Sequence, residues 1–117
     1  MKKRLCVFAS GSGTNMQAVM DQIDQGNING EIALLIASAP DIGAIARAQS
    51  KGIPFRVFSR KDFASSEERD KAIIKTLKEF NIDYIILAGY LGILTKELIS
   101  HYPNKIINIH PSLLPKF

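Results

Sequence analysis

The sequence contains a single cysteine, Cys6, which excludes an internal disulfide and a multi-cysteine zinc site. Cys6 stands in a short apolar run, residues 5–9, and this setting predicts a buried, unreactive thiol. The run is too short for the core of a signal peptide and far too short to cross a bilayer. We therefore expect a protein of the reducing cytoplasm with no membrane partner.

The sequence also lacks a stripe of basic residues interleaved with aromatics, so nucleic acid is not the expected partner. Lys and Arg number 15 against 11 Asp and Glu, a formal charge of +4, but residues 2–4 form the only short cluster. This balance suits a small phosphorylated substrate. No repeat, linker or low-complexity segment divides the 117 residues, which predicts a single domain.

Strand-like and helix-like segments alternate along the chain. Continuous apolar runs predict buried strands at residues 5–9, 32–37, 55–58, 84–88 and 106–109. Helical patterns are expected from Thr14 or Asn15 to Gly26, in an Ala-rich stretch ending near Gly52, from Ser65 or Ser66 to Asn81, and over most of residues 91–102. The predicted fold class is α/β, a Rossmann-like, mostly parallel sheet with helices on both faces.

Residues 113–117 are apolar and follow the fifth predicted strand without a helix to cover it. We therefore expect residues 1–117 to be the N-terminal portion of a domain. The C-terminal part of that fold would be missing from this chain, or a partner would cover the exposed surface.

Ligands of open α/β sheets bind beyond the carboxyl ends of the strands, which directs attention to three segments. The first is the loop after strand one, where Ser12, Gly13, Thr14 and Asn15 combine small residues, hydroxyls and a helix start. Such a loop suits a single phosphate. The alternative is a tight turn in which Thr14 or Asn15 caps the helix.

The second segment, residues 89–94, follows strand four and combines two glycines with Leu91, Ile93 and Leu94. It is suited to form one wall of a pocket for a flat heterocycle. The alternative is that Leu91 and Leu94 are core residues of the next helix.

The third segment contains Asn108 and His110 at the end of strand five, two residues apart and so on one side of an extended chain. An amide and an imidazole there predict a donor for an oxyanion and a proton carrier. His101, near a helix end, is interpreted as structural.

The motifs Ser-Gly-Ser-Gly-Thr-Asn (residues 10–15), Leu-Ala-Gly-Tyr (87–90) and Asn-Ile-His-Pro-Ser-Leu-Leu-Pro (108–115) closely resemble those of the phosphoribosylglycinamide formyltransferase family, over the whole chain. The third motif alone also occurs in methionyl-tRNA formyltransferases and formyltetrahydrofolate deformylases. The resemblance implies the N-terminal part of the formyltransferase fold and transfer of a formyl group from the co-substrate 10-formyltetrahydrofolate to glycinamide ribonucleotide, without a metal.

By this resemblance, Asn108 and His110 are the catalytic residues. The residues expected to bind the substrate phosphate are Ser12, Gly13, Thr14 and Asn15, and those expected at the folate are Leu91, Gly92, Ile93, Leu94, Asn108 and Ser66.

The chain departs from the family in three places. Ser66 and Gly92 stand where relatives often carry basic residues, with Arg60 and Lys61 near Ser66 as substitutes. The aspartate that orients the family's histidine has no counterpart up to Phe117, so we expect little or no turnover from these residues alone.

Two other hypotheses remain: a stand-alone module that binds a phosphorylated ligand without catalysis, and a related formyltransferase or deformylase acting on another acceptor. The sequence leaves the oligomeric state open.

Overall fold

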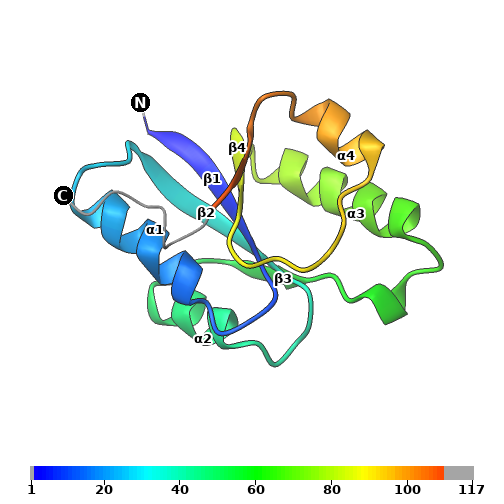
Figure 1. Cartoon of the computed structure of the whole chain (residues 1–117), viewed down its shortest axis with the longest axis horizontal. Coiled ribbons are helices and arrows are strands. Elements are labelled where there is room, and N and C mark those ends of the chain that lie inside the picture. Colours follow the sequence, from blue (N-terminus) through cyan, green and yellow to red (C-terminus); the bar gives the residue numbers. More distant parts are fainter. Residues whose placement is uncertain (1, 110–117) are drawn as a thin grey trace.

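The computed structural model describes residues 2–109, in which five strands and four α-helices alternate (Figure 1). In chain order the elements are β1 (Lys3–Ala9), α1 (Thr14–Asp24), β2 (Gly30–Ala37), α2 (Gly43–Ser50), β3 (Phe55–Val57), a 3₁₀ turn η1 (Arg60–Asp62), α3 (Ser66–Glu79), β4 (Tyr84–Leu87), α4 (Lys96–His101) and β5 (Ile106–Asn108). The five predicted strands are confirmed, with ends shifted by one to two residues.

The strands form one sheet in the order β3-β2-β1-β4-β5, and every pair is parallel. The chain moves outward from β1 to β3 and then returns to the other side of β1 with β4. The strand order therefore reverses between β1 and β4, the position where open α/β sheets leave a crevice for a ligand. This confirms the predicted fold class.

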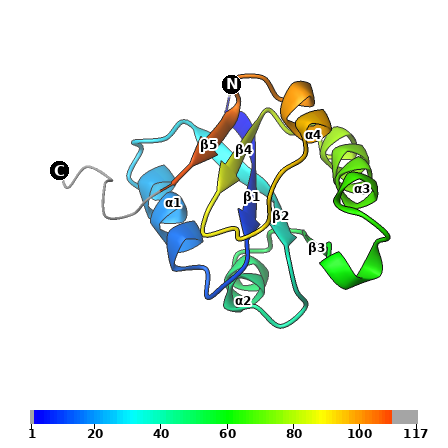
Figure 2. The same ribbon diagram turned by 45° about the vertical axis from the view of Figure 1, so that its right-hand side comes forward.

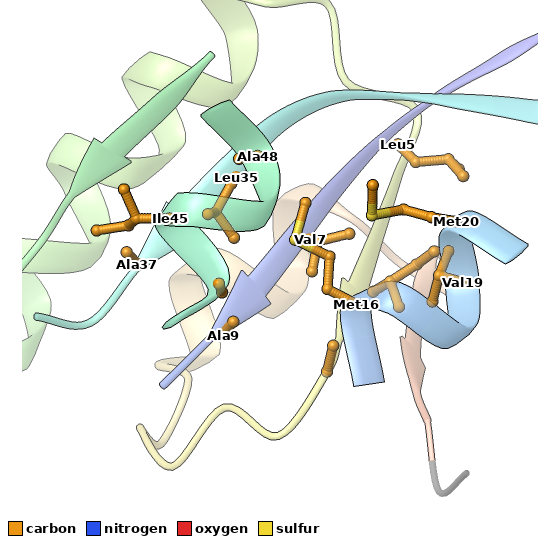
Figure 3. Close-up of a cluster of buried hydrophobic side chains, with 13 residues drawn as sticks. Leu5, Val7, Ala9, Met16, Val19, Met20, Leu35, Ala37, Ile45 and Ala48 are labelled. Atoms are coloured by element: carbon orange, nitrogen blue, oxygen red, sulfur yellow. The ribbon is translucent and has the colours of Figure 1, made fainter. Parts of the chain in front are cut away.

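One face of the sheet is covered by α1 and α2 (Figure 3). Val7 and Ala9 of β1 face this side, where Met16 and Val19 of α1 and Ile45 of α2 pack against them. The apolar residues of α1 recur at helical spacing, so one stripe of the helix is buried while the rest meets solvent.

The other face is covered by α3 and α4, which lie across the sheet from α1 and α2 (Figure 2). Cys6 and Phe8 of β1 point to this side and contact a cluster that includes Ile73 and Leu77 of α3 and Leu98 of α4. Because successive side chains of a strand point to opposite faces, the continuous apolar run of β1 supplies both cores.

The structure corrects two details of the sequence prediction. The helix expected over most of residues 91–102 is limited to Lys96–His101, and the preceding residues form a loop. The first helix is capped by Gly13, without a side-chain cap, rather than by Thr14 or Asn15. The cap of α3 is Ser65, whose Oγ accepts a hydrogen bond from the Glu68 amide.

Among residues 2–109, no helix is long and apolar enough to cross a membrane.

Candidate functional site

The β1–α1 loop (residues 10–13) delivers the start of α1 to the carboxyl edge of the sheet. Gly13 has a φ of 84°, a left-handed conformation that disfavours residues with a Cβ. Within the described residues, no hydrogen bond reaches the N–H groups of Thr14, Asn15 or Met16. These donors and the positive end of the helix dipole form a setting for an anion.

The start of α2 lies against this loop and fixes its shape. A Cβ on Gly13 would lie 2.7 Å from the Ala44 Cα, and a Cβ on Gly43 would lie 2.8 Å from the Ser12 carbonyl oxygen. The backbones of the β1–α1 loop and of the start of α2 thus lie closer together than residues with a Cβ at positions 13 and 43 would allow. The Ala44 amide also donates to the Gly11 carbonyl at 3.2 Å.

Arg47 of α2 is the one cation that holds this loop by hydrogen bonds among the described residues. Its Nε donates to the Ser12 carbonyl at 3.0 Å and its guanidinium to the Gln17 side chain at 3.2 Å. The sequence analysis missed Arg47 because it lies 35 residues from Ser12 along the chain.

Charge distribution separates this helix start from two others in the fold. The first turns of α3 and α4 contain Glu67, Glu68 and Glu97, whereas the first turn of α1 has no acidic residue. A carboxylate near a helix N-terminus would compete with an external anion for the same dipole and amides. The start of α1 therefore remains suited to an anionic ligand.

The β4–α4 loop (residues 88–95) lies beyond the neighbouring strand and exposes apolar side chains. The side chains of Leu91 and Ile93 are 87% and 85% exposed. The alternative that placed Leu91 in the core of a helix is therefore wrong. Leu94 is half-buried against the cluster beneath α3 and α4. The two most exposed residues are thus available to a ligand with an apolar face.

Gly92 is required by the ring of Tyr90. A Cβ at position 92 would lie 2.6 Å from the Tyr90 Cε2, and Tyr90 packs edge-on against Phe8 with ring centroids 5.3 Å apart. Burial raises the pKa of the Tyr90 hydroxyl; the nearby Arg69 opposes this rise and Asp70 adds to it. The ring of Tyr90 therefore fills the space that a side chain at position 92 would need.

The two loops meet at the switch point of the sheet. The Leu91 amide donates to the Ser10 Oγ at 2.9 Å. Gly89 has a φ of 72°, and a Cβ there would lie 3.3 Å from the Asn15 Nδ2. Segments about 80 residues apart in sequence are thereby placed side by side.

A cavity of about 520 Å³ opens between the β4–α4 loop and the start of α3. Leu91, Gly92, Ile93 and Ser66 line it, so the structure brings four of the predicted folate residues together. Its other lining residues are Ser10, Ser38, Phe58, Ser59, Arg60, Lys61, Arg69 and Tyr90. Two of the described lining residues, Arg60 and Lys61, are exposed cations and none is acidic, a composition suited to a ligand with carboxylates.

Arg69 and Asp70 form a buried ion pair beside the cavity, with Nε and Oδ1 3.2 Å apart. An Arg69 terminal nitrogen donates to the Ile93 carbonyl at 3.1 Å, and Asp70 Oδ2 accepts from the Thr95 amide at 2.8 Å. The sequence analysis missed this pair because two charged residues in a helix rich in charge are typical of a solvated face.

The remaining predicted residues lie elsewhere. Asn108 ends β5 and is exposed; it pairs in register with Leu87 and does not line the cavity. Leu94 lines an adjoining hollow of about 560 Å³, which shares Ser66 and Ile93 with the cavity. His110 lies outside the described residues.

Cys6 is fully buried, as predicted, and this burial raises the pKa of its thiol well above the ordinary value.

Comparison with known proteins shows which family this chain is similar to. The model of a family described as formyl transferase matches residues 3–117. The phosphoribosylglycinamide formyltransferase of Haemophilus influenzae is 43% identical over 98% of this chain and 54% of its own length, and that of Bacillus subtilis is 38% identical over 98% and 59%. The crystal structure of glycinamide ribonucleotide transformylase 1 from Geobacillus kaustophilus matches all of this chain and 62% of that one, with a TM-score of 0.90 and 46% identity. This chain thus spans little more than half the length of these relatives.

Proposed function

This chain belongs to the formyl transferase family, and we propose that it provides the acceptor-phosphate site and part of the folate site of a phosphoribosylglycinamide formyltransferase. In the proposed reaction, the formyl group of 10-formyltetrahydrofolate passes to the amine of glycinamide ribonucleotide, a step of purine biosynthesis. The cytoplasmic setting expected from the sequence stays a prediction.

We assign the phosphate of glycinamide ribonucleotide to the start of α1. The backbone N–H groups of Thr14 and Asn15 would donate to its oxygens, together with the side-chain amide of Asn15 and the exposed hydroxyls of Ser12 and Thr14. Gly13 lets the backbone turn there, and the first turn has no carboxylate to repel the ligand. Arg47 holds the loop from behind and adds positive charge.

We assign the folate to the cavity beside the β4–α4 loop. Leu91 and Ile93 would present apolar surface to the ring system. The family resemblance also implies folate contacts for Leu94 and Asn108, which do not line this cavity. Arg60 and Lys61, close to Ser66, would attract the carboxylates at the other end of the folate. These cations supply the charge that Ser66 and Gly92 lack.

The chemistry follows from the charges that develop during transfer. The acceptor amine attacks the formyl carbon, and the carbonyl oxygen gains negative charge as the tetrahedral intermediate forms. The side-chain amide of Asn108 would donate a hydrogen bond to that oxyanion. His110 would take the proton from the attacking nitrogen, and N10 of the folate leaves with a proton, giving formylated ribonucleotide and tetrahydrofolate.

One observation carries this proposal: the contact between the two loops at the switch point. Because Ser10 binds the Leu91 amide and Asn15 lies against Gly89, an acceptor bound at α1 and a folate bound at the β4–α4 loop would be neighbours. Transfer between two substrates requires such proximity.

The test is calorimetric titration of the chain with glycinamide ribonucleotide, with tetrahydrofolate and with inorganic phosphate. We expect Asn15→Ala to weaken the ribonucleotide and leave tetrahydrofolate unchanged. Asn27→Ala is the matched control, since Asn27 lies beyond the opposite end of α1. Equal affinity of Asn15→Ala and wild-type protein for the ribonucleotide would contradict the assignment.

The same titration separates the other hypotheses. Binding of the ribonucleotide without tetrahydrofolate would favour a phosphate-binding module. Binding of tetrahydrofolate without the ribonucleotide would favour a family member that acts on another acceptor.

A further inference from the structure

We propose that Arg69 and Asp70 are positioning residues that hold the β4–α4 loop open as a wall of the cavity. The inference rests on the proposed function, since it concerns the loop assigned to the folate. Neither residue needs to touch the reacting atoms, and their effect would pass through the backbone at Ile93 and Thr95.

Both charged side chains of the pair are almost completely buried. The Arg69 side chain is 3% exposed and that of Asp70 is 0% exposed. Charges are rarely buried unless partners satisfy them. Beyond their mutual contact, the side-chain hydrogen bonds that this pair makes within residues 2–109 both go to the β4–α4 loop, at the Ile93 carbonyl and the Thr95 amide.

The loop needs such support because its own composition does not explain its position. Residues 88–95 contain no helix or strand, and Gly89 and Gly92 give the backbone freedom. Leu91 and Ile93 nevertheless project into solvent, although burying them would be favoured. Every second residue from 91 to 95 has its backbone held by a side chain outside the loop. Ser10 accepts from the Leu91 amide, Arg69 donates to the Ile93 carbonyl, and Asp70 accepts from the Thr95 amide.

A purely structural role explains the pair less well. Replacing a buried ion pair by apolar residues of similar size is often neutral or stabilising, so stability alone gives little reason for two buried charges. Thr95 also caps α4, its Oγ1 accepting from the Leu98 amide at 3.3 Å. Asp70 therefore fixes the point where the loop ends and α4 begins.

The test replaces both charges at once, as Arg69→Met with Asp70→Leu, in the 117-residue chain. This change removes both hydrogen bonds to the loop without leaving one charge buried and unpaired. Amide hydrogen exchange of Thr95 is compared with that of Val7 and Leu35 in the sheet. We expect Thr95 to exchange about tenfold faster or more, as for loss of one hydrogen bond, while the sheet amides keep their protection.

Binding supplies the second readout. We expect the double variant to bind tetrahydrofolate about tenfold more weakly and glycinamide ribonucleotide with unchanged affinity, because the start of α1 is not attached to the pair. Arg69→Met with Asp70→Asn leaves no charge buried and keeps an oxygen for the Thr95 amide, so it should retain most of that amide's protection. If the apolar pair does not fold, this variant is the second test: loss of Thr95 protection while Val7 and Leu35 keep theirs would contradict the role given to the oxygen at position 70.

The results separate the two proposals. Unchanged Thr95 exchange in a folded double variant would overturn the positioning role, and so would faster exchange with full tetrahydrofolate affinity. If the wild-type chain binds no tetrahydrofolate, the folate assignment fails. Amide hydrogen exchange of Thr95 would still test whether the pair holds the loop.

Discussion

The two loops at the carboxyl edge of the sheet are held in different ways. The β1–α1 loop is fixed by backbone fit: glycines at positions 13 and 43 let the starts of α1 and α2 approach to within contact distance. The β4–α4 loop is fixed by side chains of Ser10, just after β1, and of Arg69 and Asp70 in α3, which reach its backbone. The β1–α1 loop thus depends mainly on glycines at its close contacts with α2, to which Arg47 adds one hydrogen bond, whereas the β4–α4 loop depends mainly on side-chain hydrogen bonds to its backbone.

This difference matches the parts that we assign to the loops. A phosphate is small and is bound by backbone N–H groups, so its site needs a rigid and accurate backbone. A larger ligand with an apolar ring system needs exposed apolar surface, which must be kept from collapsing onto the core. Substitutions that affect one loop and spare the other therefore test the comparison.

The largest effect is expected from breaking the buried ion pair on one side only. Arg69→Met leaves the Asp70 carboxylate buried without its partner, which should lower the free energy of unfolding by about 3–5 kcal/mol. Urea denaturation measures the loss. Lys75→Met, at an exposed lysine of α3, should stay within about 0.5 kcal/mol of wild type. Similar losses for both variants would contradict the role given to the pair.

The next effect should come from Gly13→Ala in the β1–α1 loop. The left-handed backbone and the close approach of Ala44 predict a loss of about 2–4 kcal/mol, again measured by urea denaturation. Gly11→Ala is the matched control, because a Cβ at position 11 has no heavy atom within 4 Å. If the two alanines destabilise equally, the loop is not fixed by backbone contact with α2.

A smaller effect is expected from Arg47→Met, which removes the hydrogen bonds to the Ser12 carbonyl and Gln17. The expected loss is about 1 kcal/mol of stability, together with weaker binding of inorganic phosphate. Lys51→Met, at an exposed lysine just after α2, should change neither. Phosphate binding measured by calorimetry at two salt concentrations would show whether the Arg47 charge contributes.

The smallest effect concerns alkaline pH. Burial raises the pKa of the Tyr90 hydroxyl above 10.0, so the folded protein holds this proton more tightly than the unfolded chain. The resulting stability is complete below pH 10 and is lost as the pH rises through the folded-state pKa. Tyr90→Phe should therefore flatten the fall in melting temperature above pH 10. An unchanged slope would show that this hydroxyl is not buried in solution.

Much of the fold was predictable because strand and helix periodicity is a local property of the sequence. The continuous apolar runs located all five strands, and the helical pattern expected from Ser65 or Ser66 to Asn81 located α3. Residues 91–95 were predicted wrongly because apolar residues in a short loop have the same pattern as a helix start. Tertiary hydrogen bonds to Ile93 and Thr95 favour the loop instead.

For the candidate site, the sequence identified the two loops but not what holds them. Ser12 to Asn15 and Leu91 to Ile93 stand out because glycines and small polar residues follow predicted strands. Arg47, Arg69 and Asp70 do not stand out, since each lies in a helix whose pattern alone suggests a solvated face. Their partners are 24 to 35 residues away in the sequence.

The sequence by itself determined the α/β alternation, the parallel sheet and the family, because these depend on residue types at short spacings. Only the tertiary structure decided that the β1–α1 and β4–α4 loops touch, that a basic cavity opens beside them, and that a buried ion pair supports one wall. Such contacts depend on the order of strands in the sheet and on helices packed across it. No local pattern encodes those distances.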